Sequence, residues 1–379
     1  MKYGLLALIA ALTLSVDASA LAEDQPSIFT SKGELGEALF FDTNLSANRT
    51  QSCATCHNPE YGFADPRGMA SLGDDGVSLG DRNAPTATYA AFSPVFHRDE
   101  AGEWIGGQFL DGRAPTLMDQ AAGPPLNPGE MAMPDRPSII ERLRENPDYE
   151  QAFDALFGPG ILDDPDAGYR AMTEAIAAFE QTDLFAPFDS RYDRFLRGEV
   201  ELTNDEELGR LLFFSQQFTN CNLCHQLGRS AIDPQETFSD YTYHNIGTPI
   251  NTVLRGMNGL SPETVDDGLF ANPNVDDPNQ RGKFRVPTLR NVAVTAPYMH
   301  NGVFEDLRTV ILFYNRYNSR SDARQINPET GEPFGMPEVP ETLSVEELTH
   351  GPALDDRRID ALVAFLKTLT DARYEHMLE

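Results

Sequence analysis

Two short motifs contain every cysteine of the chain. They read Cys53-Ala54-Thr55-Cys56-His57 and Cys221-Asn222-Leu223-Cys224-His225, so each places a histidine directly after a Cys-x-x-Cys pair. Two thiols at this spacing can both reach the vinyl groups of one haem, and the adjacent imidazole can then bind the iron from below. Zinc binding and dithiol redox chemistry are the alternative interpretations of Cys-x-x-Cys. Because the complete pattern occurs twice and leaves no cysteine over, we interpret both motifs as c-type haem attachment sites. The predicted thioether links are Cys53, Cys56, Cys221 and Cys224, and the predicted iron ligands are His57 and His225.

The group opposite each histidine decides what the iron can do. An iron with two strong protein ligands carries electrons, whereas an iron with an open face can bind peroxide or oxygen. Similar Gly-containing segments occur at residues 111–117 and 301–307, and seven residues beyond them stand Pro124 and Tyr314 respectively. Proline cannot bind iron and tyrosine can. We therefore expect an open haem in the first half and a closed haem in the second.

The elements that must position these motifs are mostly helical. Each haem motif follows a similar segment, at residues 36–41 and 209–214. Apolar residues recur at helical spacing in residues 138–157, 169–179, 205–214, 307–317 and 355–369, and Thr203 with Glu206 forms a predicted capping box. Long strand-like alternation is scarce, and stretches rich in Pro, Gly and Asp indicate long loops. The sequence predicts a mostly α fold of two cytochrome c-like helical haem domains, related by internal duplication and joined by long loops.

The first 22 residues have the pattern of a secretory signal peptide, with an early lysine, an apolar stretch and small residues near its end. We expect export to the periplasm, where c-type haem can be attached. The predicted domains are then residues 23–182 and 183–379, with Asp183–Glu201 as the linker between them.

The composition excludes several classes of function. The 379 residues include 59 Asp+Glu and 29 Lys+Arg, which gives a formal net charge of −30. Such a surface repels phosphate backbones and attracts basic proteins, so we expect no nucleic-acid partner. No segment after the signal peptide has the ~18 apolar residues that a membrane-spanning helix needs.

These residues resemble the bacterial dihaem cytochrome c peroxidase and MauG superfamily. The resemblance covers nearly all of the mature chain. It rests on both haem motifs and their order, on residues 111–117 (Asp-Gly-Arg-Ala-Pro-Thr-Leu), on residues 123–131, and on the segment from Val286 to Gly302. It implies a peroxidatic N-terminal haem domain and an electron-transfer C-terminal haem domain.

The resemblance also implies roles for individual residues. Gln120, Pro124 and Glu130 match the distal pocket of the peroxidatic haem, where Glu130 could shuttle the proton that peroxide cleavage requires. Tyr314 matches the tyrosine that MauG uses as a ligand of the second haem, and Met299 is the competing ligand.

A calcium ion between the haem domains is a further implication of the resemblance. The matching residues are Asn83, Thr295 and Pro297, which would offer amide, hydroxyl and carbonyl oxygens, as calcium prefers.

The chain departs from the family pattern at two points. Residues 58–96 contain no histidine, so we expect an N-terminal haem that needs no reductive activation. The tryptophan that usually bridges the haems is replaced by Leu110, and the one tryptophan of the chain is Trp104.

The first functional hypothesis is an exported dihaem peroxidase. It would reduce hydrogen peroxide at the N-terminal haem with electrons that a small c-type cytochrome or copper protein delivers through the C-terminal haem. The alternative is a MauG-like enzyme that uses high-valent dihaem iron to oxidise tryptophan or other residues on a partner protein. A second alternative is a dihaem electron carrier without catalysis. The resemblance also implies a homodimer, the assembly of many relatives.

Overall fold

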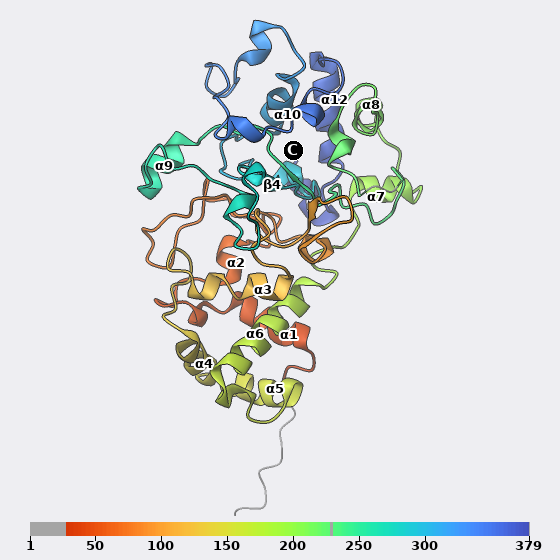
Figure 1. The fold of residues 1–379 in the computed structure, drawn as a ribbon. Coiled ribbons are helices and arrows are strands. Elements are labelled where there is room, and N and C mark those ends of the chain that lie inside the picture. The colour runs from red at the N-terminus through yellow and green to blue at the C-terminus, as the bar shows by residue number, and fades with distance from the viewer. Residues whose placement is uncertain (1–27, 228–229, 379) are drawn as a thin grey trace, which may run out of the picture.

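The computed structural model describes residues 28–227 and 230–378, so the predicted signal peptide lies outside the described residues. Helices dominate the fold, and the two halves of the chain form the two ends of the molecule (Figure 1). The helices of the N-terminal half are α1 (Lys32–Phe41), α2 (Cys53–Cys56), α3 (Leu117–Ala121), α4 (Arg136–Arg144), α5 (Pro147–Phe157) and α6 (Pro165–Glu180). Those of the C-terminal half are α7 (Arg191–Leu196), α8 (Asn204–Phe213), α9 (Thr252–Asn258), α10 (Leu307–Asn315), α11 (Val345–Leu348) and α12 (Asp356–Lys367).

Strands are limited to two small antiparallel ribbons in the described chain. The first pairs β1 (His97–Arg98) with β2 (Trp104–Ile105), and the second pairs β3 (Tyr243–His244) with β4 (Phe284–Arg285). Long loops connect these elements and short 3₁₀ turns interrupt them, as the Pro- and Gly-rich stretches predict. The expectation of a mostly helical fold is confirmed.

Each half has its own apolar core, and each core is built around one close helix pair. In the N-terminal half α1 packs on α6, and a Cβ added at Gly36 would lie 1.9 Å from the Ala175 carbonyl oxygen. In the C-terminal half α8 packs on α12, and a Cβ at Gly209 would lie 1.9 Å from the Ala361 carbonyl oxygen. Both repeated segments therefore begin with glycine because the backbones of the paired helices meet there.

The Gly-containing segments near residues 111 and 301 have the same geometry. The Gln108 amide donates to the Ala114 carbonyl at 2.7 Å, and the Tyr298 amide donates to the Phe304 carbonyl at 2.7 Å. Helices α3 and α10 then begin at equivalent positions, three residues after the two carbonyls. The sequence alignment therefore matches the backbone up to the start of the two helices, after which α3 ends at Ala121 and α10 continues to Asn315.

The helix boundaries follow local capping signals. The capping box of Thr203 and Glu206 is confirmed at the start of α8. The helix expected over residues 138–157 is wrong as a single element, because Asn146 caps a new helix whose first residue is Pro147. Proline is favoured at a first helical position and cannot continue the preceding helix. The helix expected over 307–317 ends at Asn315.

The segment expected to be a linker is partly folded. It contains α7, and the fully buried Tyr192 packs in the core of the C-terminal half. Segments from both halves meet between the two cores, where the Asn83 amide donates to the His300 carbonyl at 2.7 Å and the Tyr374 hydroxyl donates to the Pro59 carbonyl at 2.8 Å.

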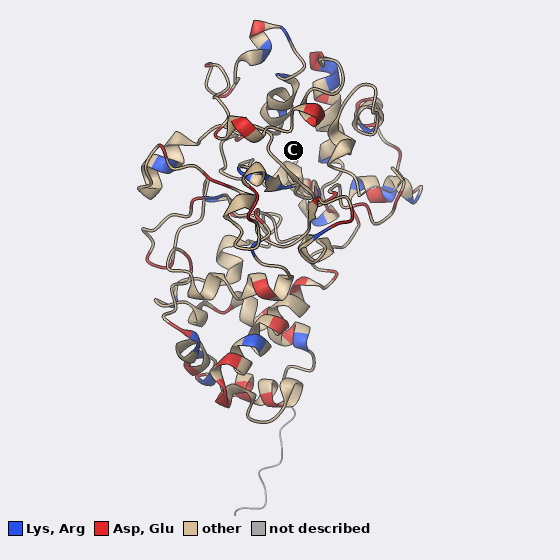
Figure 2. Cartoon of the chain, viewed as in Figure 1, with Lys and Arg blue, Asp and Glu red and all other residues tan. Residues whose placement is uncertain are grey.

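None of the helices in the described residues is long and apolar enough to cross a membrane. Acidic residues occur on helices and loops at both ends of the molecule (Figure 2), as expected for a chain with a net charge of −30.

Candidate functional site

His57 is held in the orientation that an iron ligand needs. It follows the short helix α2, and its backbone amide donates to the Cys53 carbonyl at 2.8 Å. The imidazole Nδ1 lies 3.2 Å from the Phe63 carbonyl oxygen. Because a carbonyl oxygen only accepts, Nδ1 carries the hydrogen and the lone pair of Nε2 is left for a metal. Burial lowers the pKa of His57, which favours the neutral form that binds iron.

His225 has the same arrangement. Its Nδ1 lies 3.2 Å from the Phe238 carbonyl oxygen, and burial lowers the pKa of the imidazole to about 4. Phe63 and Phe238 both adopt left-handed backbone conformations, with φ of 52° and 57°. This conformation is uncommon for a residue with a Cβ. Phe63 is six residues after His57 and Phe238 is thirteen residues after His225, yet each chain segment turns its carbonyl to the histidine in the same way.

A continuous cavity surrounds the second motif. It is lined by Cys221, Cys224, His225, Met299 and Tyr314. Both candidates for the second haem ligand, Tyr314 and Met299, therefore line the same cavity as the proximal histidine. Apolar side chains form much of the remaining wall, among them Phe213, Val286, Leu289, Ile311, Leu362 and Leu366.

Tyr314 projects from α10 into this cavity. Burial raises the pKa of its hydroxyl, and the nearby thiols of Cys224 and Cys221 raise it further. Without a metal the phenol would therefore stay protonated, so binding to a cation is what would release its proton.

The residues of both motifs fit a covalently bound haem. Cys53, Cys56, Cys221 and Cys224 are free thiols, and burial raises the pKa of each. The second pair lines an apolar cavity beside a neutral histidine whose Nε2 is available. Among the described residues no cluster of three or more His, Cys, Asp or Glu could hold a metal ion. Haem would supply an iron that can exchange electrons and bind peroxide.

The cavity extends to the boundary between the two halves. Asn83, Thr295 and Pro297, the predicted calcium ligands, all line it. The amide nitrogen of the Asn83 side chain donates to the Met69 carbonyl at 3.2 Å. This contact orients the Asn83 side chain through its nitrogen, so the side-chain oxygen is not used in the bond and can face a hard cation such as calcium.

The predicted distal residues Gln120, Pro124 and Glu130 lie on one compact segment. Gln120 is in the last turn of α3, and its carbonyl accepts from the Gly123 amide at 2.9 Å. The Met131 amide donates to the Pro124 carbonyl at 3.2 Å, which brings the two ends of the following turn together. Pro124 and Glu130 are thereby held close to each other.

Glu130 is a partly buried carboxyl near the first haem motif. Its Oε1 accepts from Asn127 Nδ2 at 2.7 Å. Burial raises the pKa of Glu130, while Asn127 and Arg113 oppose the shift. Besides burial, the charge of Glu130 contributes to the raised pKa of Cys53 and of Cys56, so the carboxyl lies within electrostatic range of both thiols. The raised pKa makes Glu130 a better proton acceptor than an exposed carboxylate.

Glu180 is a further buried carboxyl that the sequence analysis missed. It is 5% exposed at the end of α6, and its Oε2 has no hydrogen-bond partner in the described part of the chain. Burial alone raises its pKa to about 8, and its charge is the second largest cause of the raised pKa of Cys53. The signal was available in the sequence, because Glu180 stands four residues after Ile176 on the apolar face of the helix.

The positions of Leu110 and Trp104 are also defined. Leu110 lines the cavity, and its carbonyl accepts from the Arg285 amide at 2.9 Å. Trp104 lies on β2 and stacks on Phe96, with ring centroids 4.9 Å apart. Trp104 therefore belongs to a side ribbon, and an aliphatic side chain lies where the cavity meets the N-terminal half.

The chain matches known proteins of one family. Residues 30–201 match the family model described as di-haem cytochrome c peroxidase. The methylamine utilization protein MauG of Paracoccus denitrificans is 54% identical over 379 residues, which cover 99% of this chain and 97% of that protein. The cytochrome c551 peroxidase of Pseudomonas aeruginosa is 34% identical, over 73% of this chain and 70% of that protein.

A solved structure agrees with these matches. The diheme peroxidase BthA of Burkholderia thailandensis aligns with a TM-score of 0.80 and 33% identity, over 91% of this chain and 87% of that one. The haem motifs, the fold and the relatives all point to the same class of enzyme, an oxidoreductase with two c-type haems. The chain belongs to the dihaem cytochrome c peroxidase and MauG family.

Proposed function

We propose that this protein activates hydrogen peroxide at the haem bound by His57 and uses the resulting oxidising power to withdraw electrons from another protein. The overall reaction takes one peroxide, two electrons and two protons to two waters. The haem bound by His225 would pass the electrons between the protein surface and the first haem.

One observation carries this proposal. The backbone equivalence of the segments near residues 111 and 301 supports the sequence alignment that pairs Pro124 with Tyr314. Pro124 has no side-chain group that can bind iron, whereas Tyr314 lines the cavity of the second haem motif. One iron would then be open to peroxide and the other closed.

Glu130 would manage the protons of the reaction. Peroxide cleavage needs a group that takes the proton from the oxygen next to the iron and returns it to the leaving oxygen. Burial raises the pKa of Glu130 and so makes it a better proton acceptor, and the turn that starts at Pro124 fixes its place. Gln120, four residues before Pro124, would line the same distal pocket of the His57 haem.

Tyr314 would be the second ligand of the His225 iron. An anionic oxygen ligand favours the higher oxidation states of iron, whereas the thioether of Met299 would favour the reduced state. A calcium ion held by Asn83, Thr295 and Pro297 would fix the boundary between the two haem sites.

The parallel contacts of the two halves support an internal duplication with domains at residues 23–182 and 183–379. The close helix pairs at Gly36 and Gly209 and the carbonyl contacts of the two histidines are its structural basis. Haem attachment and the signal-peptide pattern of residues 1–22 support a periplasmic location.

Two kinds of protein could supply the electrons. The expected tyrosine ligand, the absence of histidine from residues 58–96 and the 54% identity to MauG favour a MauG-like enzyme that oxidises residues of a partner protein. The match to the cytochrome c551 peroxidase and the aliphatic Leu110 favour the second candidate, a peroxidase that takes electrons from a small cytochrome.

The proposal is tested by mixing the purified holoprotein with hydrogen peroxide and following the haem spectrum with and without a reduced small cytochrome c. Sustained oxidation of the cytochrome identifies a cytochrome peroxidase. A long-lived oxidised haem spectrum that is unaffected by the cytochrome identifies the MauG-like enzyme. A haem spectrum that does not respond to peroxide contradicts both.

The role of Glu130 is tested by Glu130→Gln. This substitution removes the proton acceptor but retains the shape of the side chain, so the rate of the peroxide-induced spectral change should fall about 10²- to 10⁴-fold. The exposed Glu60, near the same haem motif, is the matched control, and Glu60→Gln should leave the rate unchanged.

A further inference from the structure

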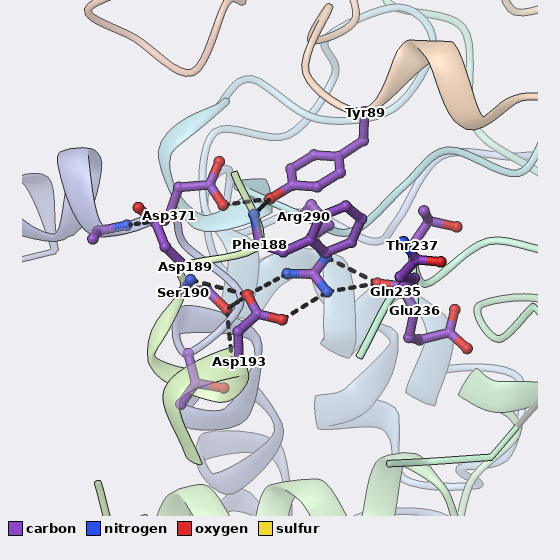
Figure 3. A network of polar contacts seen from close by, with 12 residues as sticks. Tyr89, Phe188, Asp189, Ser190, Asp193, Gln235, Glu236, Thr237, Arg290 and Asp371 are labelled. Carbon is purple, nitrogen blue, oxygen red and sulfur yellow. Dashed lines mark hydrogen bonds and ion pairs between the residues drawn. The ribbon is translucent and has the colours of Figure 1, made fainter. Parts of the chain in front are cut away.

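A buried polar network lies where the two halves meet (Figure 3). It joins Tyr89 of the N-terminal half to Asp193, Arg290 and Asp371 of the C-terminal half, and none of these side chains is more than 2% exposed. The distal pocket and the haem motifs described above do not use any of the four.

Tyr89 and Asp371 form a buried phenol–carboxylate pair. The Tyr89 hydroxyl donates to Asp371 Oδ1 at 2.6 Å, and the Phe188 amide donates to the Tyr89 oxygen at 3.3 Å. The other carboxylate oxygen of Asp371 accepts from Asn291 Nδ2 at 2.7 Å. The tyrosine proton therefore already points along a short hydrogen bond at a base that could accept it.

Arg290 lies against the same tyrosine. Its guanidinium carbon is 5.1 Å from the centre of the Tyr89 ring, and two of its nitrogens bond the carboxylate of Asp193 at 2.6 and 3.0 Å. The same guanidinium donates to the Glu236 carbonyl at 2.7 and 2.9 Å. The Asp193 and Asp371 carboxylates thus share one buried guanidinium, and the carboxyl group of the buried Glu236 also lies within its electrostatic range.

The network connects the carbonyls that orient the two haem-motif histidines. The Phe63 carbonyl, which accepts from His57, also accepts from the Ala87 amide at 3.0 Å, two residues before Tyr89. The Phe238 carbonyl accepts from His225, and the Phe238 ring lies 5.5 Å from the guanidinium carbon of Arg290. Tyr89 and Arg290 therefore lie between the proximal sides of the two sites.

The backbone of Tyr89 is held in a strained conformation. Its φ of 58° lies in the left-handed region, which a bulky side chain rarely adopts. The Tyr89 amide donates to the Phe185 carbonyl at 3.0 Å and so fixes this geometry. This backbone conformation is therefore held by the surrounding fold, and it directs the Tyr89 phenol to Asp371.

From this geometry we propose that Tyr89 is a redox relay between the two haem sites, with Asp371 as its proton acceptor. In the forward step one electron leaves the Tyr89 ring for the peroxide-oxidised His57 site, and the phenolic proton moves from the oxygen to Asp371 Oδ1. In the return step an electron that the reducing partner delivers through the His225 site reaches Tyr89, and the proton moves back. This relay rests on the proposed function, which supplies the oxidant.

The charges of the cluster favour this step. A tyrosine that has lost an electron is a strong acid, so proton transfer to the adjacent carboxylate accompanies the oxidation. Burial raises the pKa of Asp371, which makes it a better acceptor than an exposed carboxylate. Loss of the electron makes the charge of the buried cluster more positive by one unit while the proton stays inside it, which favours oxidation where acidic groups outnumber the one buried cation.

The test uses electron paramagnetic resonance on the holoprotein, frozen at short times after hydrogen peroxide is added. Protein with ring-deuterated tyrosine shows whether an organic radical belongs to a tyrosine, because deuteration narrows its signal. We expect a tyrosyl radical in the wild-type protein and its loss in Tyr89→Phe and in Asp371→Asn.

Tyr374→Phe is the matched control. Tyr374 is 2% exposed and also bonds across the two halves, but its hydroxyl donates to the Pro59 carbonyl, which cannot take a proton. The radical should persist in this variant. Absence of the radical from the wild-type protein, or its persistence in Tyr89→Phe with an unchanged haem spectrum, overturns the relay.

Failure of the proposed function is distinguished by the haem spectrum. If peroxide leaves that spectrum unchanged, photogenerated tris(bipyridine)ruthenium(III) replaces it as the one-electron oxidant. A tyrosyl radical that depends on Tyr89 then supports the relay without peroxide chemistry, and its absence overturns the relay.

Discussion

Replacing Glu180 by glutamine should change how the stability of the protein depends on pH. The buried Glu180 carboxyl has a pKa of about 8 in the folded protein, against an ordinary value of 4.5. The folded protein therefore binds this proton more tightly than the unfolded protein does. This proton therefore contributes to the free energy of unfolding. Linkage requires that its contribution is fully present below the pKa of the unfolded state and is lost as the pH rises through the pKa of the folded state.

The size of the effect follows from the two pKa values. The wild-type carboxyl destabilises the folded state by about 1 kcal/mol at pH 5 and by about 5 kcal/mol at pH 9, relative to a side chain that does not titrate. Glu180→Gln removes the titration and keeps the shape. The variant should therefore gain about 4 kcal/mol over the wild-type protein between about pH 5 and about pH 9.

The assay is urea unfolding of the holoproteins at both pH values, followed by far-ultraviolet circular dichroism. Glu141→Gln, which changes an exposed carboxyl on α4, is the control and should follow the wild-type protein at both pH values. A Glu180→Gln variant whose unfolding free energy keeps the same difference from the wild-type protein at both pH values would refute the assignment of a buried, proton-binding carboxyl.

Three further tests by substitution address the haem sites and the buried network. Replacing both Cys53 and Cys56 by serine should reduce the covalently bound haem from two to one per chain in a pyridine haemochrome assay, and an unchanged haem content would contradict the attachment sites. Tyr314→Phe should convert the second haem from low spin to high spin in the paramagnetic resonance spectrum, whereas Tyr317→Phe, three residues further on, should not. Arg290→Met should destabilise the protein by about 3–5 kcal/mol in urea unfolding because it leaves a buried carboxylate without its cation, and a smaller loss in the double variant with Asp193→Leu would identify that cause.

Local sequence signals predict part of the fold. The haem motifs, the capping box at Thr203 and the repeated Gly-led segments at residues 36–41 and 209–214 depend on residues close together in the chain or on a repeated pattern, whereas the packing of Gly36 on Ala175 and of Gly209 on Ala361 is visible only in the structure. The predicted single helix over residues 138–157 fails because Pro147 and its cap at Asn146 are also local signals, and they outweigh the apolar periodicity.

Local sequence patterns identify some of the site residues but do not show which of them meet in space. The cavity that joins Tyr314 to Asn83 exists because loops of both halves meet there. The pairing of Tyr89 with Asp371 joins residues 282 positions apart, and periodicity carries no information about such a contact. Glu180 could have been found from its place on the apolar face of its helix, but its missing partner is visible only in three dimensions.

The most direct test of the central claim is the paramagnetic resonance spectrum of the resting holoprotein before and after one equivalent of hydrogen peroxide. An open iron at His57 and a closed iron at His225 predict one high-spin and one low-spin ferric signal at rest, with peroxide removing the high-spin signal within the mixing time. Two low-spin signals that peroxide leaves unchanged would contradict the claim that this protein activates peroxide at its N-terminal haem.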